Sequence, residues 1–513
     1  MPTTTLQLEN IQGNILGGFN KDFQANLFLR FTSDRAGRAW VKEISKEVEE
    51  SSSALVIKFN AQFSALRAQK VRNPEQLIAA VWVNLALSYQ GLKAVKLKES
   101  SDLEKFPKAF RDGMAKRSAA NGDVGPSEPA KWIPPFNHSE TVHAVLIVAA
   151  DHPQALQQKV DEIMGKPAFK AGVQVLLDQR GNTRPDRPGH EHFGFKDGVS
   201  QPGLRGVDTP DDPIGNPDQG HPGQDLLWPG EFVLGYATQI SKEKPGVDGP
   251  NPDPGPHSHS GPAWTRDGSY LVFRRLRQDV AGFNQHLANL ATSLGWSEDL
   301  TGAKLVGRYK SGVPIEKRKF QPDPYTPPST DPGNETTGNP PLGNNPTLNN
   351  NFEFGDDPDR ALCPLSAHIR KAYPRDEFTG KPKEDSESRT QTHRLLRRGI
   401  PYGVPYDPHD SASASLDRGL LFFCYQKDIE EQFEFVQRQL VNNSDFPPKL
   451  DEAPPLPGAP GEDPIIAQSA KGDMLITPEK KPVSIQHFVT TTGGEYFFSP
   501  SISTLEKIGN RNV

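Results

Sequence analysis

The order of apolar segments constrains the fold of this chain more than any other sequence feature. The first half alternates strand-like runs, rich in apolar and β-branched residues, with segments whose apolar residues recur at helical spacing. The strand-like runs are Ala25–Thr32, Ala79–Leu87, Val142–Ala150 and Val173–Leu177. The helical segments are Arg38–Glu50 and Pro153–Gly165. The order is therefore strand, helix, strand, strand, helix, strand.

A similar order recurs in the second half. Its strand-like runs are Glu231–Ala237, Tyr270–Leu276, Gly419–Gln426 and Gly494–Phe498. Its helical segments are Ala281–Leu294 and Asp428–Leu440. This order predicts an α+β protein made of two ferredoxin-like halves, 1–205 and 206–513, each with helices packed on an antiparallel sheet.

Composition narrows the class of protein further. The 513 residues include 49 prolines and 45 glycines, which predict long loops at Asp208–Gly230, Lys244–Pro262 and Gln321–Asn351. A net charge of -6 argues against nucleic acid or an anionic membrane as partner. No apolar run is long enough to span a membrane. The two cysteines, Cys363 and Cys424, allow one disulfide at most.

The segment His190–Leu204, HEHFGFKDGVSQPGL, is the first candidate functional stretch. Asp197 lies there between Gly194 and Gly198, and glycines let a backbone turn sharply and approach a bound group closely. An aspartate before glycine is most often a turn residue that bonds its own backbone. The residues that follow along the chain favour a functional role instead.

Other candidate residues suggest one kind of chemistry when they are taken together. His368 lies in CPLSAHIRK, and Arg397 begins the RRG of THRLLRRGIPYG. A neutral imidazole is the commonest protein ligand of iron, and it binds best when its other nitrogen donates to a carboxylate. Peroxide on the other face of a haem needs a group that moves a proton and a fixed cation. Taken singly, His368 is an ordinary histidine and the arginines a solvated surface.

At this point the sequence resembles the dye-decolorizing (DyP-type) haem peroxidases, specifically their fungal branch. The resemblance runs along essentially the whole chain and is specific because several motifs follow in order. These are IQGNILGGFNK (11–21), HEHFGFKDG (190–198), VGRYKSGVPIE (306–316), CPLSAHIRK (363–371), RRGIPYG (397–403), GLLFFCYQ (419–426) and GGEYFFSPS (493–501). It implies a dimeric α+β barrel-like fold that binds haem b without a covalent link.

The resemblance also implies roles for individual residues. Asp197 matches the distal aspartate that moves protons, Arg397 the distal arginine, and His368 the ligand of the haem iron. Asp428 matches the acid bonded to that histidine, with Glu430 as the alternative. Asp428 also starts a predicted helix, where it can serve as a cap.

Further positions carry weaker expectations. Residues matching the distal wall of the haem pocket and the partners of its propionates are Leu420, Phe422, Arg308 and Arg370. For Arg308, a plain surface charge is the alternative. Tyr402 matches a surface residue that relays electrons to large substrates, or is a turn tyrosine. Some members oxidise Mn(II), and Glu353, Asp356 and Asp357 lie in a comparable stretch, although their pattern departs from the expected one.

The sequence therefore predicts a haem peroxidase that reduces hydrogen peroxide through an oxoferryl porphyrin radical. The resemblance implies bulky donors, namely dyes, phenolics and carotenoid-like alkenes, and either a monomer or a homodimer. It also implies an extracellular protein, although the sequence begins without signal-peptide features, which leaves a cytoplasmic location open. Two alternatives remain: a haem-handling protein without peroxidase turnover, and a cofactor-free interaction module.

Overall fold

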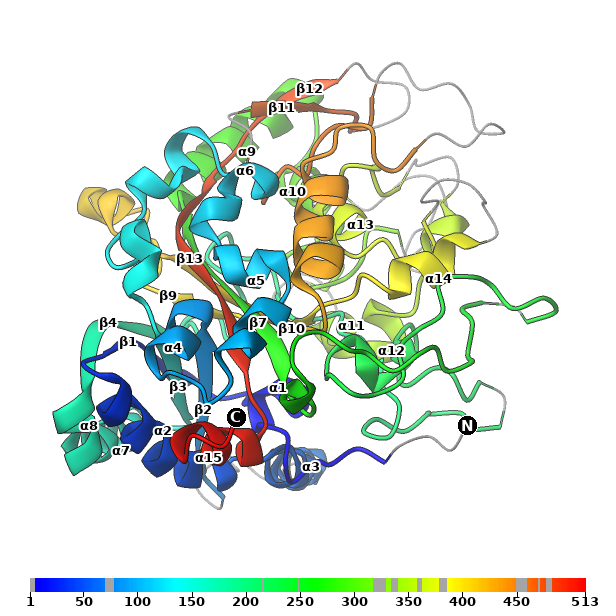
Figure 1. The fold of residues 1–513 in the computed structure, drawn as a ribbon. Helices are drawn as coiled ribbons and strands as arrows, with labels where there is room; N and C mark the ends of the chain where they lie inside the picture. The colour runs from blue at the N-terminus through cyan, green and yellow to red at the C-terminus, as the bar shows by residue number, and fades with distance from the viewer. Residues whose placement is uncertain are drawn as a thin grey trace.

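The computed structural model in Figure 1 describes most of the chain. The described residues are 5–69, 78–214, 216–247, 249–316, 329–333, 340–357, 362–377, 385–448, 459–468, 471–476 and 482–513. One antiparallel sheet of nine strands runs through the molecule, and both halves of the chain contribute to it.

The first half builds one end of this sheet. Its strands are β1 (Phe23–Phe31), β2 (Val81–Ser88), β3 (Ala144–Ala150) and β4 (Val173–Asn182). They lie in the order β4-β1-β3-β2, and Leu27 of β1 faces Leu146 of β3 in register. β3 is buried along its whole length because its run AVLIVAA has no polar side chain that would need water.

The second half repeats this strand order. Its strands are β7 (Ser269–Gln278), β8 (Leu396–Arg397), β9 (Ile400–Tyr402), β10 (Gly419–Gln426) and β13 (Val489–Ser499). They lie in the order β13-β7-β10, and both β8 and β9 pair with β10. β13 also pairs with β2, so the two halves share one sheet, as Figure 1 shows along the red strand. The predicted fold class, two ferredoxin-like α+β halves, is confirmed.

The sheet curves until its two outer parts approach each other. Gly181 of β4 lies against β9, and a Cβ at this position would be 2.7 Å from Ile400 Cγ2 and 3.0 Å from Pro401 O. Arg275 of β7 donates through Nε to Gln179 Oε1 of β4 at 2.8 Å, across the space that the sheet encloses. The sheet is therefore rolled up in the manner of a barrel.

Helices cover the sheet on its outer side and fill the second half. Those of the first half are α1 (Gly13–Leu16), α2 (Asp34–Glu49), α3 (Ser53–Ala68), α4 (Tyr89–Ala94), α5 (Lys108–Asp112), α6 (Ser118–Asn121), α7 (Pro153–Gly165) and α8 (Pro167–Gly172). Those of the second half are α9 (Val280–Leu294), α10 (Glu298–Val306), α11 (Pro340–Asn344), α12 (Pro346–Asn349), α13 (His368–Ala372), α14 (Ser386–Gln391) and α15 (Ile502–Gly509). α2 begins where Ser33 Oγ accepts the Ala36 N–H, and its buried stripe includes Trp40 and Ile44.

Two predicted elements take a different form. Glu231–Ala237 is not a strand: a 3-10 turn, η7 (Pro229–Glu231), opens it, and Gly235 has a φ of 94°. The buried Glu231 carboxylate there accepts from Lys427 Nζ and Gln239 N, which ties the run to loops and not to a sheet. The helix expected at Asp428–Leu440 consists of two π-helical segments, η13 (Ile429–Glu434) and η14 (Val436–Val441).

The loop predictions were partly borne out by the described residues. Asp208–Gly230 contains β6 (Leu226–Leu227), which pairs with β5 (Gly203–Leu204). β11 (Lys471–Met474) and β12 (Val483–Gln486) form another small sheet. Much of Gln321–Asn351, namely 321–328 and 334–339, lies outside the described residues. Cys363 and Cys424 are both buried and free, so the disulfide that composition allows is not formed.

Within the described ranges, no helix combines the length and the apolar character that crossing a bilayer requires.

We expect Gly181→Ala to destabilise the protein by about 1–3 kcal/mol, because the new methyl group must displace Ile400 or the backbone of β9. Urea unfolding measures this loss. Gly165→Ala is the matched control, since nothing lies within 4 Å of a Cβ added at that exposed helix end. Equal stability of both variants would show that the two parts of the sheet do not meet at Gly181.

Candidate active site

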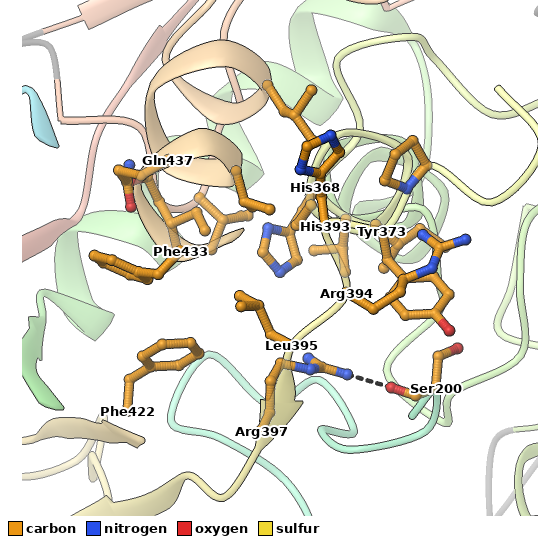
Figure 2. A pocket seen from close by; sticks show the side chains of 18 of the residues that line it. Ser200, His368, Tyr373, His393, Arg394, Leu395, Arg397, Phe422, Phe433 and Gln437 are labelled. Atoms are coloured by element: carbon orange, nitrogen blue, oxygen red, sulfur yellow. Dashed lines mark hydrogen bonds between the residues drawn. The ribbon is translucent and has the colours of Figure 1, made fainter. Parts of the chain in front are cut away.

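A cavity of about 1020 Å³ is lined mostly by residues of the second half, together with residues 191–200 of the first half. It is bounded by the loop that carries Asp197, by β8 and β10, by α13, and by the π-helical segments. Figure 2 shows His368 and Arg397 at opposite sides of its open space, with aromatic Phe422 and Phe433 along another side.

His368 is the first residue of α13, and its ring is oriented by a buried carboxylate. His368 Nδ1 lies 2.8 Å from Asp463 Oδ2, and Asp463 is completely buried. The other carboxylate oxygen, Asp463 Oδ1, accepts the backbone N–H groups of Ile465 and Ile466 at 2.8 and 3.0 Å. With Nδ1 bonded in this way, Nε2 is the ring nitrogen left for a ligand in the cavity.

The electrostatics of this pair favour an electron-rich imidazole. Burial by itself would lower the pKa of His368, but the charge of Asp463 and the hydrogen bond outweigh it and raise the pKa. Burial would likewise raise the pKa of Asp463, yet His368 and the two backbone N–H groups lower it. Asp463 is therefore a stable carboxylate against which His368 can hold a proton on Nδ1.

Asp197 and Arg397 lie together on the other side of the cavity. Arg397 Nη1 is 3.7 Å from Asp197 Oδ1, and both side chains are partly exposed, by 30% and 40%. Asp197 Oδ1 accepts the N–H of Gly198 at 2.7 Å, the turn bond expected for an aspartate before glycine. The turn and the cavity-facing position therefore coexist, and a small molecule can reach both groups.

Arg397 is held by its strand and by the loop that bears Asp197. β8 pairs with β10 at Arg397 and Cys424. Gln201 exchanges two hydrogen bonds with the Arg397 backbone, and the guanidinium donates to Ser200 O, as the dashed line in Figure 2 marks. Arg397 and the loop that bears Asp197 are thus fixed relative to each other.

The wall beside these groups is apolar because β10 alternates. Leu421 and Phe423 are fully buried on the side of the sheet that faces the core. The ring centroids of Phe423 and Phe273 lie 4.8 Å apart there. Leu420 and Phe422 point the opposite way and line the cavity. The alternation predicted from the sequence therefore places Leu420 and Phe422 on the same side of β10, toward the cavity.

Positive charge gathers at one edge of the cavity. Arg308 and Arg375 both donate to Ser200 Oγ, at 2.9 and 3.2 Å, close to Arg397. Burial, together with Arg375 and Arg397, lowers the pKa of Arg308 to about 9. Arg394 Nε and Nη1 are buried without a hydrogen-bond partner among the described residues. Such an edge favours an anionic group.

These features fit an iron porphyrin. The free nitrogen of His368 can bind iron, Leu420 and Phe422 provide an apolar wall, and the unpartnered N–H groups of Arg394 match carboxylates such as propionates. A second imidazole, His393, also lines the cavity. Its Nδ1 is bonded to the Glu431 carbonyl oxygen, and its ring stacks on Phe435 at 3.7 Å.

The predicted carboxylate partner of the histidine was wrong. Asp428 caps η13, since its Oδ1 accepts the N–H groups of Glu430 and Glu431 at 2.8 and 2.9 Å. The alternative, Glu430, accepts from Ala109 N and faces Arg117. The residue bonded to His368 is Asp463, which the sequence analysis missed. It stands 95 positions further along the chain, and its one local signal is the pair of apolar residues at 465–466.

Two further expectations, Arg370 as a propionate partner and Tyr402 as a surface relay, are wrong because both side chains are buried. The Arg370 guanidinium pairs with Glu377 and, at 3.3 Å, with Asp357, so its charge is balanced inside the protein and not at the cavity. Tyr402 is only 3% exposed and its hydroxyl donates to Asp417 Oδ1 at 3.2 Å. It is therefore not a surface residue that could relay electrons to a large substrate.

The carboxylates considered for Mn(II) are not arranged as a cation site. Asp357 accepts the N–H groups of Leu362 and Cys363 and pairs with Arg370. Glu353 is half-buried, and the burial of its carboxyl group raises its pKa well above the usual range. Among the described residues, no group of three His, Cys, Asp or Glu side chains could hold a metal ion.

Comparison with known proteins agrees with this geometry. The family model described as "DyP dimeric alpha+beta barrel domain" matches residues 10–185, and "Dyp-type peroxidase, C-terminal" matches residues 254–452. Dye-decolorizing peroxidase msp1 of Mycetinis scorodonius is 31% identical over 529 residues, which cover 98% of this chain and 88% of that protein. AauDyP1 of Auricularia auricula-judae is 31% identical over 514 residues, 98% of this chain and 87% of that protein.

Solved structures are similar over nearly the same length. An ancestral D-type dye decolorizing peroxidase superposes with a TM-score of 0.75 at 33% identity and covers 99% of this chain and 100% of its own. A fungal DyP-type peroxidase from Auricularia auricula-judae superposes with a TM-score of 0.73 at 29% identity, and the match covers 99% of this chain and 100% of its own. The chain belongs to the dye-decolorizing peroxidase family and is a haem-dependent peroxidase.

Proposed function

We propose that Asp197 is the acid–base group of this peroxidase, that Arg397 stabilises charge, and that His368 ligates the haem iron. The observation that carries the proposal is that one cavity separates the His368–Asp463 pair from the Asp197–Arg397 pair. A carboxylate–histidine pair on one side and a carboxylate–guanidinium pair on the other match the needs of peroxide cleavage.

Each side has its own task. Bound haem supplies the iron that activates hydrogen peroxide and takes two oxidising equivalents from it. A carboxylate oxygen of Asp197 accepts the proton from one peroxide oxygen and returns it to the other, which leaves as water. Arg397 stabilises the negative charge on the departing oxygen. Asp463 keeps the proton of His368 on Nδ1, so that the lone pair of Nε2 would be free to hold the iron.

The cationic edge would receive the haem propionates. Arg308 and Arg394 line the cavity there, and Arg394 has two unpartnered N–H donors. Arg394 also lies over the Tyr373 ring, 3.9 Å from its centroid, which holds the guanidinium plane in place. We assign both arginines to the propionates, and Leu420 and Phe422 to the wall over the distal face.

Aromatic molecules are the proposed electron donors, with dyes, phenolics and carotenoid-like alkenes as the classes to test. A solved dye-decolorizing peroxidase 30% identical to this chain was obtained in complex with 2,6-dimethoxyphenol. Mn(II) oxidation is left out of the proposal, because the described carboxylates form no cation site. Tyr402 is left out as a relay, because it is buried.

Three further assignments rest on the resemblance to the fungal branch. We propose an extracellular protein, residues 1–205 and 206–513 as its two halves, and a monomer or homodimer. The division is supported by the strands, since β1–β4 fall in the first range and β7–β10 and β13 in the second. Fractionation of the native culture tests the location, and light scattering the oligomeric state.

One relative favours haem handling as a second candidate. The deferrochelatase of Yersinia pestis is 33% identical over 180 residues, which cover 35% of this chain and 29% of that protein. The Asp197–Arg397 pair favours peroxidase turnover, because storage of haem needs no proton shuttle. A peroxide-dependent dye assay separates the two, since haem handling alone gives no decolorisation.

Asp197→Asn should slow the reaction with peroxide by about 10²–10⁴-fold, because an amide cannot accept the proton. Stopped-flow mixing of the haem-loaded variant with hydrogen peroxide measures this rate. The Soret band before mixing controls for bound haem and should be unchanged. A rate equal to that of the wild type would remove Asp197 from the proposed role.

His368→Ala should lose haem or ligate it wrongly, and the ultraviolet–visible spectrum after loading with haemin should show a shifted or missing Soret band. His393→Ala is the matched control, since His393 lines the same cavity but its Nδ1 is bonded to a carbonyl group and not to a carboxylate. If His393→Ala shows the loss of the Soret band and His368→Ala does not, His393 binds the iron and the assignment of His368 is wrong.

Asp463→Asn should raise the reduction potential of the iron. The neutral amide cannot make the His368 ring electron-rich, and its NH₂ group must face either His368 Nδ1 or the backbone N–H groups. Spectroelectrochemical titration of the haem-loaded protein measures the potential. Asp428→Asn is the control and should leave it unchanged, because asparagine caps helices about as well as aspartate. Equal shifts in both variants would contradict the assignment.

A further inference from the structure

Glu191 is a carboxylate at the edge of the cavity that the mechanism above does not use. It lies six positions before Asp197, in the segment 189–198 that we call the distal loop. Its side chain is half-buried and lines the cavity. A carboxylate that is partly removed from water beside a proposed reacting group requires a structural or chemical reason.

The Glu191 carboxylate is the acceptor at the centre of the distal loop. Oε2 accepts the Phe193 N–H at 2.7 Å and a hydrogen bond from Gln278 Nε2. Oε1 accepts the Phe195 N–H at 2.8 Å. Three donors therefore converge on two oxygens, and two of these donors are backbone groups of the loop itself. Burial nevertheless raises the pKa of Glu191, because the site is shielded from water.

The rest of the loop is arranged around this carboxylate. The Glu191 N–H donates to Phe195 O at 3.0 Å, which closes the turn, and Gly194 makes the turn possible with a φ of 95°. After the turn, the Asp197 N–H donates to Gly189 O at 3.0 Å. The backbone position of Asp197 thus depends on a turn whose inner side is held by Glu191.

Gln278 extends this arrangement to the sheet. It is the last residue of β7, and its Nε2 connects the loop carboxylate to a strand in the middle of the sheet. Without Glu191, the loop would keep its own backbone bonds but would lose this side-chain link to β7.

We propose that Glu191 is a positioning residue that holds the distal loop so that the Asp197 carboxylate stays aligned with Arg397 and with bound peroxide. The proposal rests on the role proposed above for Asp197. Glu191 itself transfers no proton, because both of its oxygens already accept hydrogen bonds from the loop and from Gln278.

Glu191→Gln tests the proposal with almost no change in volume. A glutamine has one oxygen and one NH₂ group for three donors, so at least one loop N–H loses its acceptor whichever way the amide is turned. We expect the stopped-flow rate with hydrogen peroxide to fall by about 10- to 100-fold, since small misplacements of catalytic groups have effects of this size. The Soret band and the KM for a reducing donor should be unchanged.

Asp208→Asn is the matched control. Asp208 is another carboxylate that accepts a backbone N–H, that of Leu204 at 2.8 Å, but it is exposed and is not among the residues that line the cavity. It should leave the peroxide rate unchanged. Cyanide binding gives a second readout without turnover, because hydrogen cyanide must also lose a proton before it binds iron, and Glu191→Gln should slow it in parallel.

A double-mutant cycle with Asp197→Asn decides how Glu191 acts. If Glu191 works through Asp197, Glu191→Gln slows the wild type but causes no further loss in the Asp197→Asn background. Equal losses in both backgrounds would overturn the proposal, because Glu191 would then act independently. The proposal would also be overturned if Glu191→Gln reacts with peroxide at the wild-type rate while Asp197→Asn reacts slowly. That result would leave the proposed function of Asp197 intact.

The remaining outcomes are also decisive. An unchanged rate in Asp197→Asn alone would show that the proposed function of Asp197 is wrong, and the inference about Glu191 would fall with it. If Glu191→Gln does not fold, Gln278→Ala replaces it in the cycle, because this change removes the Gln278 Nε2 donor and keeps the carboxylate. If Gln278→Ala lowers the peroxide rate several-fold in the protein that keeps Asp197 but not in the Asp197→Asn background, the proposal is supported. If Gln278→Ala leaves the rate unchanged in both backgrounds, the proposal is overturned.

Discussion

The hydrogen bond between His368 and Asp463 is the interaction on which the site depends. It joins the first residue of α13 to a carboxylate 95 positions later, and it is buried on the Asp463 side. A charged group is stable in such a place only when hydrogen bonds compensate for the lost water, and Asp463 receives them from Ile465 and Ile466 as well as from His368. The orientation of the imidazole is therefore set by the chain after the π-helical segments.

The opposite side of the cavity is organised by charge of the other sign. Arg308, Arg375 and Arg397 all donate to Ser200, two of them to its hydroxyl and one to its carbonyl oxygen. Guanidinium groups at such close range repel each other. Burial lowers the pKa of Arg308, and the charges of Arg375 and Arg397 lower it further. An anionic group bound at this edge would relieve that repulsion and thereby stabilise the folded protein.

The sequence was sufficient for the long strands of the large sheet, although it also predicted a strand at Glu231–Ala237 that is not formed. GLLFFCYQ is β10 over its whole length, and its alternation places Leu420 and Phe422 at the cavity. The partner of His368 could not be found in this way. Asp428 has the local pattern of a helix cap and is one, whereas Asp463 meets His368 through a contact between residues 95 positions apart.

Tyr402 shows the same limit in another form. Its motif RRGIPYG suggests a turn at the surface, and nothing near it in the sequence indicates that β4 and β9 approach each other. In the folded protein the Arg275 guanidinium lies over the Tyr402 ring within the curved sheet, with Arg275 Cζ 4.2 Å from the ring centroid. Exposure is a property of the closed sheet and not of the local motif.

The pairing of β13 with β2 has a consequence for biogenesis. β13 follows every other strand of the large sheet in the sequence, yet it stands in the middle of that sheet, and its first residue, Val489, lines the cavity. Until β13 takes its place, the two halves do not form one continuous sheet, and the edges of β2 and β7 that it covers are unpaired. An unpaired strand edge can pair with another chain, so late placement of β13 makes folding intermediates of this protein prone to aggregation.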